Sequence, residues 1–181
     1  SKLSSPRRVD AVKAHSSTGA FWFFGTASAG FDALCNQRAN QLSWPKGQRR
    51  YEVAMVLELA KFKPIHYEAT IDGEHRSFDA MLCAVANGPA FGGGMMIAPD
   101  AKVDDGFIDL FIVHAMSRLE LLKVFPKVYS GSHVSHPAVE FIRAKSVKLS
   151  SGNMPVYSDG EARGHSPLTS TLVPGALSVF A

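Results

Sequence analysis

The sequence predicts a mainly β protein, a distorted β-sandwich with two or three peripheral helices. Three observations predict this fold class. Short apolar segments of strand length recur along the chain and are separated by turn residues. Helical periodicity is confined to a few segments. The regular strand–helix alternation of a parallel nucleotide-binding fold is missing. The 181 residues suit one domain, which we expect to span residues 1–181.

The N-terminal region combines a polar start with an aromatic segment. Residues 1–17 are polar, and the segment Ala20–Gly25 contains four aromatic side chains. Its length and composition predict a strand buried on both faces. The small residues at 27–30 predict a tight turn with close backbone approach, and residues 31–40 are expected to form a short helix.

A second helix and a hairpin are predicted in the middle of the chain. Between Tyr51 and Phe62, apolar residues recur at steps of three and four, which indicates an amphipathic helix: Val53, Val56, Leu57 and Ala60. Pro64 ends this helix. Residues 66–71 and the segment from Arg76 onward read as a hairpin, with Asp72-Gly73-Glu74 as its turn. A buried strand at 81–86 then enters a glycine-rich loop at 91–100.

The C-terminal part is rich in predicted strands. Ser117 and Glu120 form a capping box, so a helix begins there, which Pro126 can shorten and Gly131 can close. Strands are expected at residues 106–113, 139–149, 154–157, 168–173 and 176–180. Pro174-Gly175 is the expected turn between the last two strands.

Composition and charge exclude several classes of protein. The chain is 46% hydrophobic and 19% charged with a net charge of +3, too mild an excess to indicate a nucleic-acid binder. Cys35 and Cys83 form neither a metal pattern nor a disulfide framework, which favours a reducing cytosol. No apolar run reaches the ~18 residues of a membrane helix. The chain does not begin with Met, so we expect a fragment of a longer protein.

Two acidic segments could carry chemistry, and each has a plain structural alternative. Three carboxylates between Asp100 and Gly106 could hold a hard cation such as Mg²⁺, although an ordinary Asp-Gly turn is the simpler interpretation. Asp159-Gly160-Glu161 could supply a general base and its partner, or could be a hairpin turn like Asp72-Gly73-Glu74. His133 and His136 are expected to have a capping or packing role.

An ordered set of segments resembles the C-terminal half of the diacylglycerol kinase, sphingosine kinase and bacterial lipid kinase family. The segments, in chain order, are 85–88, 91–95, 98–101, 104–106, 131–137, 159–161 and 173–177, with a looser match at 29–33. The resemblance implies a two-domain kinase whose N-terminal domain holds ATP with a GGDGT loop, which this chain lacks. The chain would then be the second domain, of the NAD kinase/diacylglycerol kinase-like fold, which forms the lipid pocket.

The resemblance also implies roles for individual residues. Asp105, with the backbone carbonyls of Lys102 and Phe107, matches the Mg²⁺ site of the family. Glu161 and Asp159 match the acidic pair near the transferring phosphate, and either could accept the proton of the lipid hydroxyl. Asp32 matches an acidic residue near the lipid headgroup.

The expected partners follow from the same resemblance. They are a lipid substrate, ATP, the N-terminal kinase domain in cis and the cytoplasmic surface of a membrane. Four basic residues on or beside the second helix could meet anionic headgroups, although a solvated helix face is the commoner explanation: Arg49, Arg50, Lys61 and Lys63. Nucleic acid is not an expected partner. Exposed strand edges could support a homodimer. The alternatives are a lipid-binding β-sandwich without catalysis and a relative of NAD kinase. The isolated chain is expected to be inactive.

Overall fold

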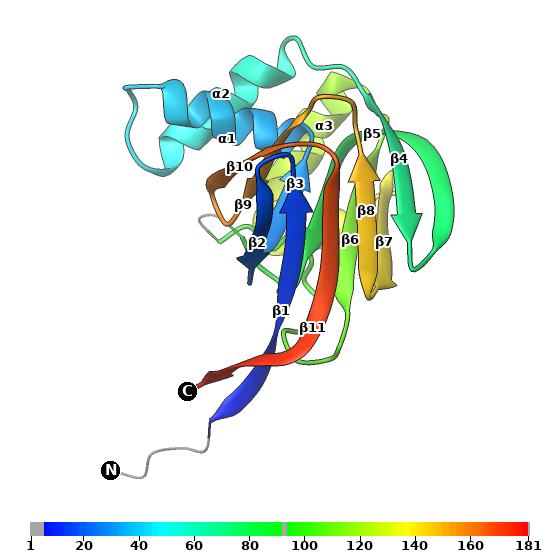
Figure 1. Cartoon of the computed structure of the whole chain (residues 1–181). Coiled ribbons are helices and arrows are strands. Elements are labelled where there is room, and N and C mark those ends of the chain that lie inside the picture. The colour runs from blue at the N-terminus through cyan, green and yellow to red at the C-terminus, as the bar shows by residue number, and fades with distance from the viewer. Residues whose placement is uncertain (1–5, 92–93, 181) are drawn as a thin grey trace.

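The computed structural model describes residues 6–91 and 94–180 of the chain, and eleven strands in this part form one branched antiparallel sheet (Figure 1). The strands are β1 Arg7–Ser16, β2 Gly19–Phe23, β3 Thr26–Ala29, β4 Ile65–Ile71, β5 Glu74–Ala86, β6 Ile108–His114, β7 Val139–Ala144, β8 Ser146–Ser150, β9 Pro155–Ser158, β10 Glu161–His165 and β11 Leu168–Val179. The mainly β fold class is confirmed.

The sheet curls into a sandwich-like shape around one core. Its main path runs β10-β9-β3-β5-β4-β8-β11-β1-β2, and β6 and β7 branch from β5. The branch is possible because β5 has 13 residues: its first half pairs with β4 and its second half pairs with β3 and β6. Apolar side chains from both layers meet in the interior, including Val12, Tyr67, Val85, Leu110 and Leu149.

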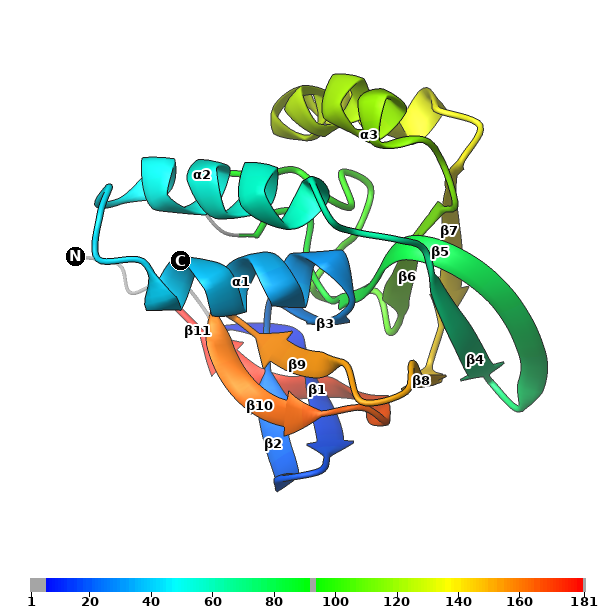
Figure 2. The same cartoon turned by 90° about the horizontal axis from the view of Figure 1, so that it is seen from above.

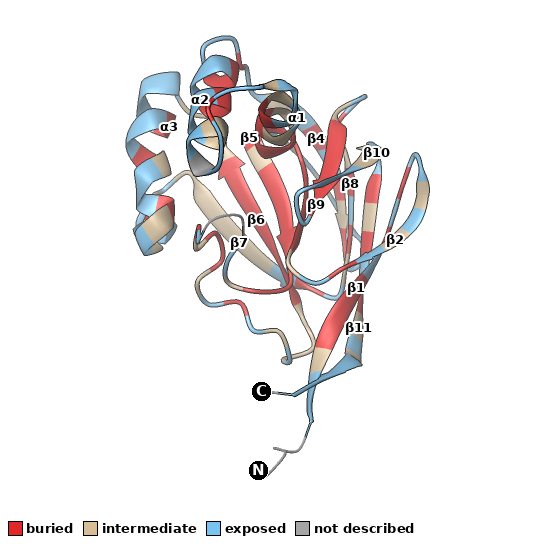
Figure 3. Ribbon diagram, turned by 90° about the vertical axis from the view of Figure 1, so that its left-hand side faces the viewer, coloured by how far each residue is buried: buried red, intermediate tan, exposed pale blue. Residues whose placement is uncertain are grey.

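Three α-helices cover the outer face of β5 and β6, as predicted. They are α1 Phe31–Gln41, α2 Gln48–Leu59 and α3 Arg118–Val124, and two 3₁₀ helices follow, η1 Phe125–Ser130 and η2 Ser132–Ser135. In Figures 2 and 3, α2 lies between α1 and α3 in one layer. Alternation along β5 sends Cys83 and Val85 into the sandwich, while Ala84 and Ala86 point to the helices. The β5–β6 part of the sheet is therefore buried on both faces.

The predicted cap and stop signals of the third helix are confirmed. The Ser117 side chain accepts a hydrogen bond from the backbone N–H of Glu120 at 3.2 Å. The α-helix changes to a 3₁₀ helix at Phe125, with Pro126 at its start, because proline has no N–H to donate within an α-helix. Gly131 closes it in the left-handed conformation with φ 71°.

The apolar stripe of the second helix faces away from the sheet. Val53, Val56 and Leu57 are 38%, 55% and 47% exposed, whereas Met55 and Leu59 on the other side are buried. The helix between Tyr51 and Phe62 is confirmed, but its two faces are both apolar, so periodicity alone did not identify the buried one.

The N-terminal region differs from the prediction in three places. Residues 7–16, described from the sequence only as polar, form the strand β1, in which Ala11, Val12 and Ala14 are buried. The aromatic segment forms β2, which pairs only with β1 and leaves Trp22 exposed, because it is an edge strand. Residues 26–29 form the buried strand β3 rather than a tight turn, because small side chains fit between β5, β9 and α1.

The C-terminal strands also differ from the prediction. Pro174-Gly175 is not a turn, because β11 continues through it from Leu168 to Val179. The register of β1 and β11 shifts at this point, between Val9 and Ala11, and the N–H of Gly175 bonds the Asp10 carboxylate at 2.7 Å. A β-bulge therefore lets β11 run through Pro174-Gly175 while it stays paired with β1. A further strand, β10, was not predicted.

None of the helices in the described part of the chain has the length and apolarity needed to cross a bilayer. Both cysteines are buried and carry free thiols.

Candidate functional site

A pocket lies under the helix layer, between the helices and the outer face of β5 and β6. It has a volume of about 60 Å³ and is mostly apolar, with side chains from β5, β6, α3 and the glycine-rich loop, among them Met81, Met95, Phe111, Leu121 and Val124. Four polar residues from β3, α1 and α2 complete the lining: Thr26, Ser28, Asp32 and Tyr51. The pocket thus joins an apolar interior to a small polar cluster.

Asp32 is the centre of the polar cluster. Its carboxylate accepts hydrogen bonds at 2.6 Å from the hydroxyls of Ser28 and Tyr51, and a longer one from the Asn36 amide. Gly30 and Phe31 place it in the first turn of α1, where the helix dipole favours a negative charge. Burial raises the pKa of Asp32 above its ordinary value of 3.8, and the hydrogen bonds from Ser28 and Tyr51 oppose that shift.

Thr26 offers the pocket a hydrogen-bonding group that the protein does not use. Its side chain is buried, and its hydroxyl has no partner among the described residues. Buried hydroxyls in native proteins are nearly always paired. A polar group of a ligand in this pocket would satisfy it.

The predicted catalytic residue Asp159 lies next to this cluster but points to the backbone. It occupies the turn between β9 and β10 with φ 48°. Its carboxylate accepts backbone N–H bonds from Phe24, Gly25 and Thr26 at 2.9–3.1 Å. Asp159 therefore fixes the turn that leads into β3 and so positions Thr26.

Glu161 is separate from the pocket in this chain. It begins β10, is exposed, and forms an ion pair with Arg163 at 2.5 Å. Its carboxylate is therefore open to a partner that approaches from outside the domain.

The predicted metal loop has oxygen donors of the right chemistry, and its carboxylate already has protein partners. Asp105 accepts the N–H of Phe107 at 3.1 Å with one oxygen and pairs with Arg143 through the other. Lys102 is exposed, and the Phe107 ring lies 4.4 Å from the Arg143 guanidinium. Carboxylate and carbonyl oxygens suit Mg²⁺, and an ion at Asp105 would compete with Arg143 for the carboxylate. Across residues 6–91 and 94–180, no group of three or more His, Cys, Asp and Glu side chains is placed to hold a metal.

Asp10 and Asn87 connect the predicted metal loop to the turn before β3, which Asp159 also holds. The side-chain amide of Asn87 donates to the carbonyls of Phe24 and Asp10, and its backbone N–H donates to the Gly25 carbonyl at 2.8 Å. The buried carboxylate of Asp10 accepts the N–H of Gly106 at 2.9 Å. Asp10 and Asn87 thus hold the loop before β6 and the turn before β3 in a fixed relation.

Sequence reasoning missed several of these residues. Asp10 belongs to a stretch described from the sequence only as polar, although a single acid among Val9, Ala11 and Val12 is a signal for a special role. Thr26, Ser28 and Tyr51 carry no motif and become recognisable only when folding brings β3 and α2 to Asp32. Asn87 belongs to a recognised segment, but its role as a bridge depends on tertiary contacts.

The remaining motifs have structural roles. Gly92 and Gly93 of the glycine-rich loop lie outside the described residues. His133 is fully buried, donates through Nε2 to the Ile97 carbonyl at 3.1 Å, and packs edge-on against Phe111. Burial lowers the pKa of His133. Its predicted packing role is confirmed, and His136 pairs with Glu120 at 3.4 Å.

Comparison with known proteins places these features in a family. The model of the YegS C-terminal NAD kinase beta sandwich-like domain matches residues 25–181. A diacylglycerol kinase of Mycobacterium tuberculosis is 38% identical over 160 residues, which cover 88% of this chain and 52% of that protein. A probable YegS-like lipid kinase of Chromohalobacter salexigens is 30% identical over 178 residues, 97% of this chain and 56% of that protein.

Solved structures agree on the fold. A putative diacylglycerol kinase from Bacillus anthracis matches with a TM-score of 0.67 at 22% identity, covering 96% of this chain and 55% of that chain. The chain spans about half the length of the curated relatives it matches. The resemblance seen in the ordered motifs is confirmed, and the chain belongs to the family of YegS C-terminal NAD kinase beta sandwich-like domains.

Proposed function

We propose that this chain is the lipid-binding, active-site-completing half of an ATP-dependent lipid kinase, with diacylglycerol as the default substrate. One observation carries the proposal: an apolar pocket ends in a buried Asp32–Ser28–Tyr51 cluster beside the unpartnered Thr26 hydroxyl. The polar cluster suits a glycerol headgroup, and the apolar lining suits acyl chains. The names of the relatives support the same chemistry.

The pocket must widen to hold a lipid. Its volume of about 60 Å³ is below the ~300–1,000 Å³ of typical ligand pockets. Met81 and Met95 line it, and methionine side chains have three rotatable bonds and adapt readily to a new shape. Binding would therefore move these side chains and the helices over them rather than the sheet.

The proposed reaction transfers the γ-phosphate of ATP to the lipid hydroxyl. The lipid oxygen forms a bond to the γ-phosphorus, the bond from that phosphorus to the bridging oxygen breaks, and ADP leaves. Glu161 accepts the hydroxyl proton directly or through water. Asp159 holds the neighbouring turn in place through its three backbone bonds. ATP would be held mainly by an N-terminal domain in cis, so we propose that this chain alone is inactive.

A Mg²⁺ site on the Asp105 loop is part of the proposal. Asp105 and the carbonyls of Lys102 and Phe107 would hold the ion, with Asp10 and Asn87 fixing the loop from behind. A bound cation supplies charge neutralisation for phosphoryl transfer. Thermal stability can test the site without an activity assay: we expect Mg²⁺ to raise the melting temperature of the chain and Asp105→Asn to abolish the increase.

The setting of the reaction is proposed to be the cytoplasmic face of a membrane, with phospholipid metabolism as its context. A homodimer through exposed strand edges remains a proposal.

One observation favours a second candidate, a lipid-binding module without catalysis: the Glu161 side chain pairs with Arg163 and does not line the pocket.

A kinase assay on the full-length polypeptide separates these candidates. Transfer of labelled γ-phosphate to diacylglycerol is expected, and Glu161→Ala and Asp105→Ala should each reduce the rate about a hundredfold or more. Glu74→Ala is the matched control for Glu161→Ala, because Glu74 is exposed and holds the same position in the other Asp-Gly-Glu turn, away from the site. Near-normal rates in both variants would refute the assigned roles, and turnover by this chain alone would refute the two-domain proposal.

A further inference from the structure

The outward face of the helix layer carries apolar side chains that no part of the described chain covers. On α2, Val53, Val56 and Leu57 are 38%, 55% and 47% exposed, while the opposite side of the same helix is buried in the core. Exposed apolar side chains that cluster on one surface mark a site of interaction with another apolar surface. The outer face of α2 is therefore expected to have an apolar partner.

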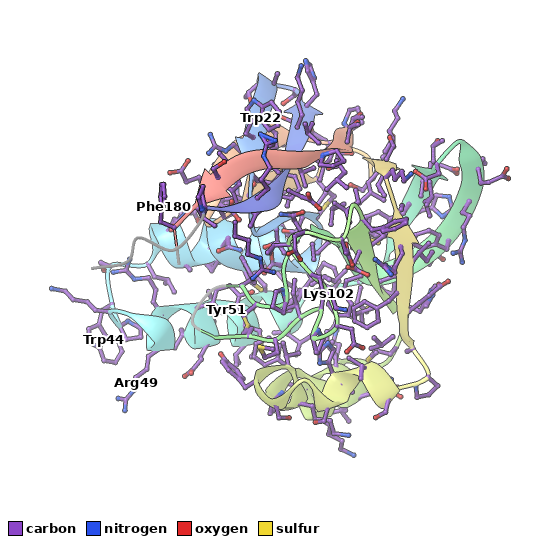
Figure 4. The ribbon with its side chains drawn as sticks, turned by 90° about the horizontal axis from the view of Figure 1, so that it is seen from below. Trp22, Trp44, Arg49, Tyr51, Lys102 and Phe180 are labelled. Atoms are coloured by element: carbon purple, nitrogen blue, oxygen red, sulfur yellow. The ribbon has the colours of Figure 1, made fainter. Side chains whose placement is uncertain are left out.

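The exposed apolar residues extend beyond α2. Trp44, in the loop between α1 and α2, is 79% exposed, and Leu119 and Leu122 on α3 are 72% and 41% exposed. The two helices are tied together, because the Arg118 guanidinium donates to the Ala60 and Phe62 carbonyls. Figure 3 shows exposed outer surfaces on both helices, and Figure 4 shows Trp44 and Arg49 projecting from one end of α2. We call this set the docking face: Trp44, Val53, Val56, Leu57, Leu119 and Leu122.

Charge identifies the partner. Between Trp44 and Lys63, the exposed charged side chains are four cations, Lys46, Arg49, Lys61 and Lys63, and one anion, Glu52. This stretch alone equals the net charge of +3 of the whole chain. A second copy of the face would bring like charges together, which is unfavourable. An anionic bilayer has the complementary charge and an apolar interior, and tryptophan prefers the boundary between the two.

We propose that the docking face lies on an anionic membrane surface, with α2 in the plane of the interface and Trp44 at headgroup level. The inference rests on the proposed function, since the membrane is where the lipid substrate resides. The same elements have inner sides that line the pocket, through Tyr51 on α2 and Leu121 and Val124 on α3. Docking would therefore bring the pocket against the bilayer, and a lipid could enter it without crossing bulk water.

Tryptophan fluorescence tests this orientation directly, because the chain has two tryptophans, Trp22 and Trp44. In a Trp22→Phe variant, Trp44 should shift to the blue and be quenched by brominated lipid when vesicles of equimolar phosphatidylcholine and phosphatidylglycerol are added. In the matched Trp44→Phe variant, Trp22 on β2 reports the other side of the molecule (Figure 4) and should not respond. Equal responses from both tryptophans, or none from Trp44, would overturn the proposal.

Charge reversals test the electrostatic part. Arg49→Glu with Lys63→Glu should weaken vesicle co-sedimentation at least about tenfold. Lys13→Glu with Lys148→Glu makes the same change of net charge on exposed residues of β1 and β8 and should leave binding within about twofold. Equal losses in both pairs would show that overall charge governs binding and would contradict a defined face.

Two further measurements separate this proposal from its alternatives. Sedimentation without lipid should show no self-association through the face, and a dimer that Val56→Asp dissolves would assign the face to a second copy instead. In the full-length polypeptide, Arg49→Glu with Lys63→Glu should retain phosphorylation of monomeric short-chain diacylglycerol while losing activity on vesicles. Vesicle binding without any lipid phosphorylation would refute the kinase function and leave the docking face in place.

Discussion

Asp72 and Asp159 begin two Asp-Gly-Glu turns with the same backbone and the same use of the carboxylate. Both have φ 48°. Asp72 accepts the backbone N–H bonds of Lys145 and Ser146, and Asp159 accepts those of Phe24, Gly25 and Thr26. At the scale of single residues, local sequence therefore sets the turn, and the location of the turn sets its function.

This pair of turns gives a controlled prediction. Asp72→Ala and Asp159→Ala should each reduce the free energy of unfolding by about 1 kcal/mol, because each removes an acceptor for several backbone N–H groups. Urea denaturation of the chain measures this. In the full-length polypeptide, Asp159→Ala alone should also reduce kinase activity. Equal activity of the two variants would show that Asp159 is only a turn residue.

Asp32 predicts a pH dependence of stability. Burial raises its pKa in the folded state above the ordinary value of 3.8, so the folded chain holds that proton more tightly than the unfolded chain. Stability from this group is then lost as pH rises from the ordinary pKa through the folded pKa. Asp32→Asn lacks this titration, so the variant should gain stability over the native chain as the pH rises above the ordinary pKa of 3.8. A constant difference over this range, measured by urea denaturation, would contradict a buried and costly carboxylate.

At the scale of secondary-structure elements, α2 is the clearest case of two competing faces. Leu59→Ala should cost about 2–5 kcal/mol because Leu59 is buried in the helix–sheet core. Val56→Ser should change stability by less than about 0.5 kcal/mol, because the residue is 55% exposed and the two side chains have similar helix propensity. Denaturation of the two variants measures the difference. A large loss in Val56→Ser would mean that the outer face is buried.

The strand β1 depends on a side chain inside its bulge. Asp10 is buried, and its two carboxylate oxygens accept the N–H groups of Gly106 and Gly175. Asp10→Ala should cost about 2 kcal/mol, because it leaves these donors unpaired. Hydrogen exchange should show faster exchange at Gly106 and Gly175 in the variant. Protection equal to that of the native chain would contradict this role of Asp10.

The elements differ in how far local sequence specifies them. The hairpin turn at Asp72-Gly73, the capped helix at Ser117 and the strands around Val85 and Leu110 were predictable, because turn residues, caps and apolar runs act over a few positions. The edge position of β2 and the passage of β11 through Pro174-Gly175 depend on pairing partners distant in sequence. The polar cluster could be anticipated only at Asp32, because β3 and α2 supply the rest through tertiary contact.

On the scale of the whole molecule, the apolar core has two parts, one inside the curled sheet and one under the helices. The interior of the curled sheet is filled by side chains such as Val85 and Leu110, whereas the layer under the helices contains the pocket. β1 and β11 extend together toward the end of the molecule away from the helices (Figure 1). β3 connects the pocket to the Asp159 turn, because Thr26 and Ser28 line the pocket and the N–H of Thr26 donates to the Asp159 carboxylate.

Binding of dioctanoylglycerol to this chain probes the proposed lipid pocket itself. Measurable binding by titration calorimetry is expected, weakened at least about tenfold by Asp32→Ala because the buried acceptor for the headgroup is lost. Asp79→Ala removes an exposed carboxylate on β5 and should leave the affinity unchanged. Absence of binding, or equal affinity in a folded Asp32→Ala variant, would contradict the assignment of the pocket to the lipid.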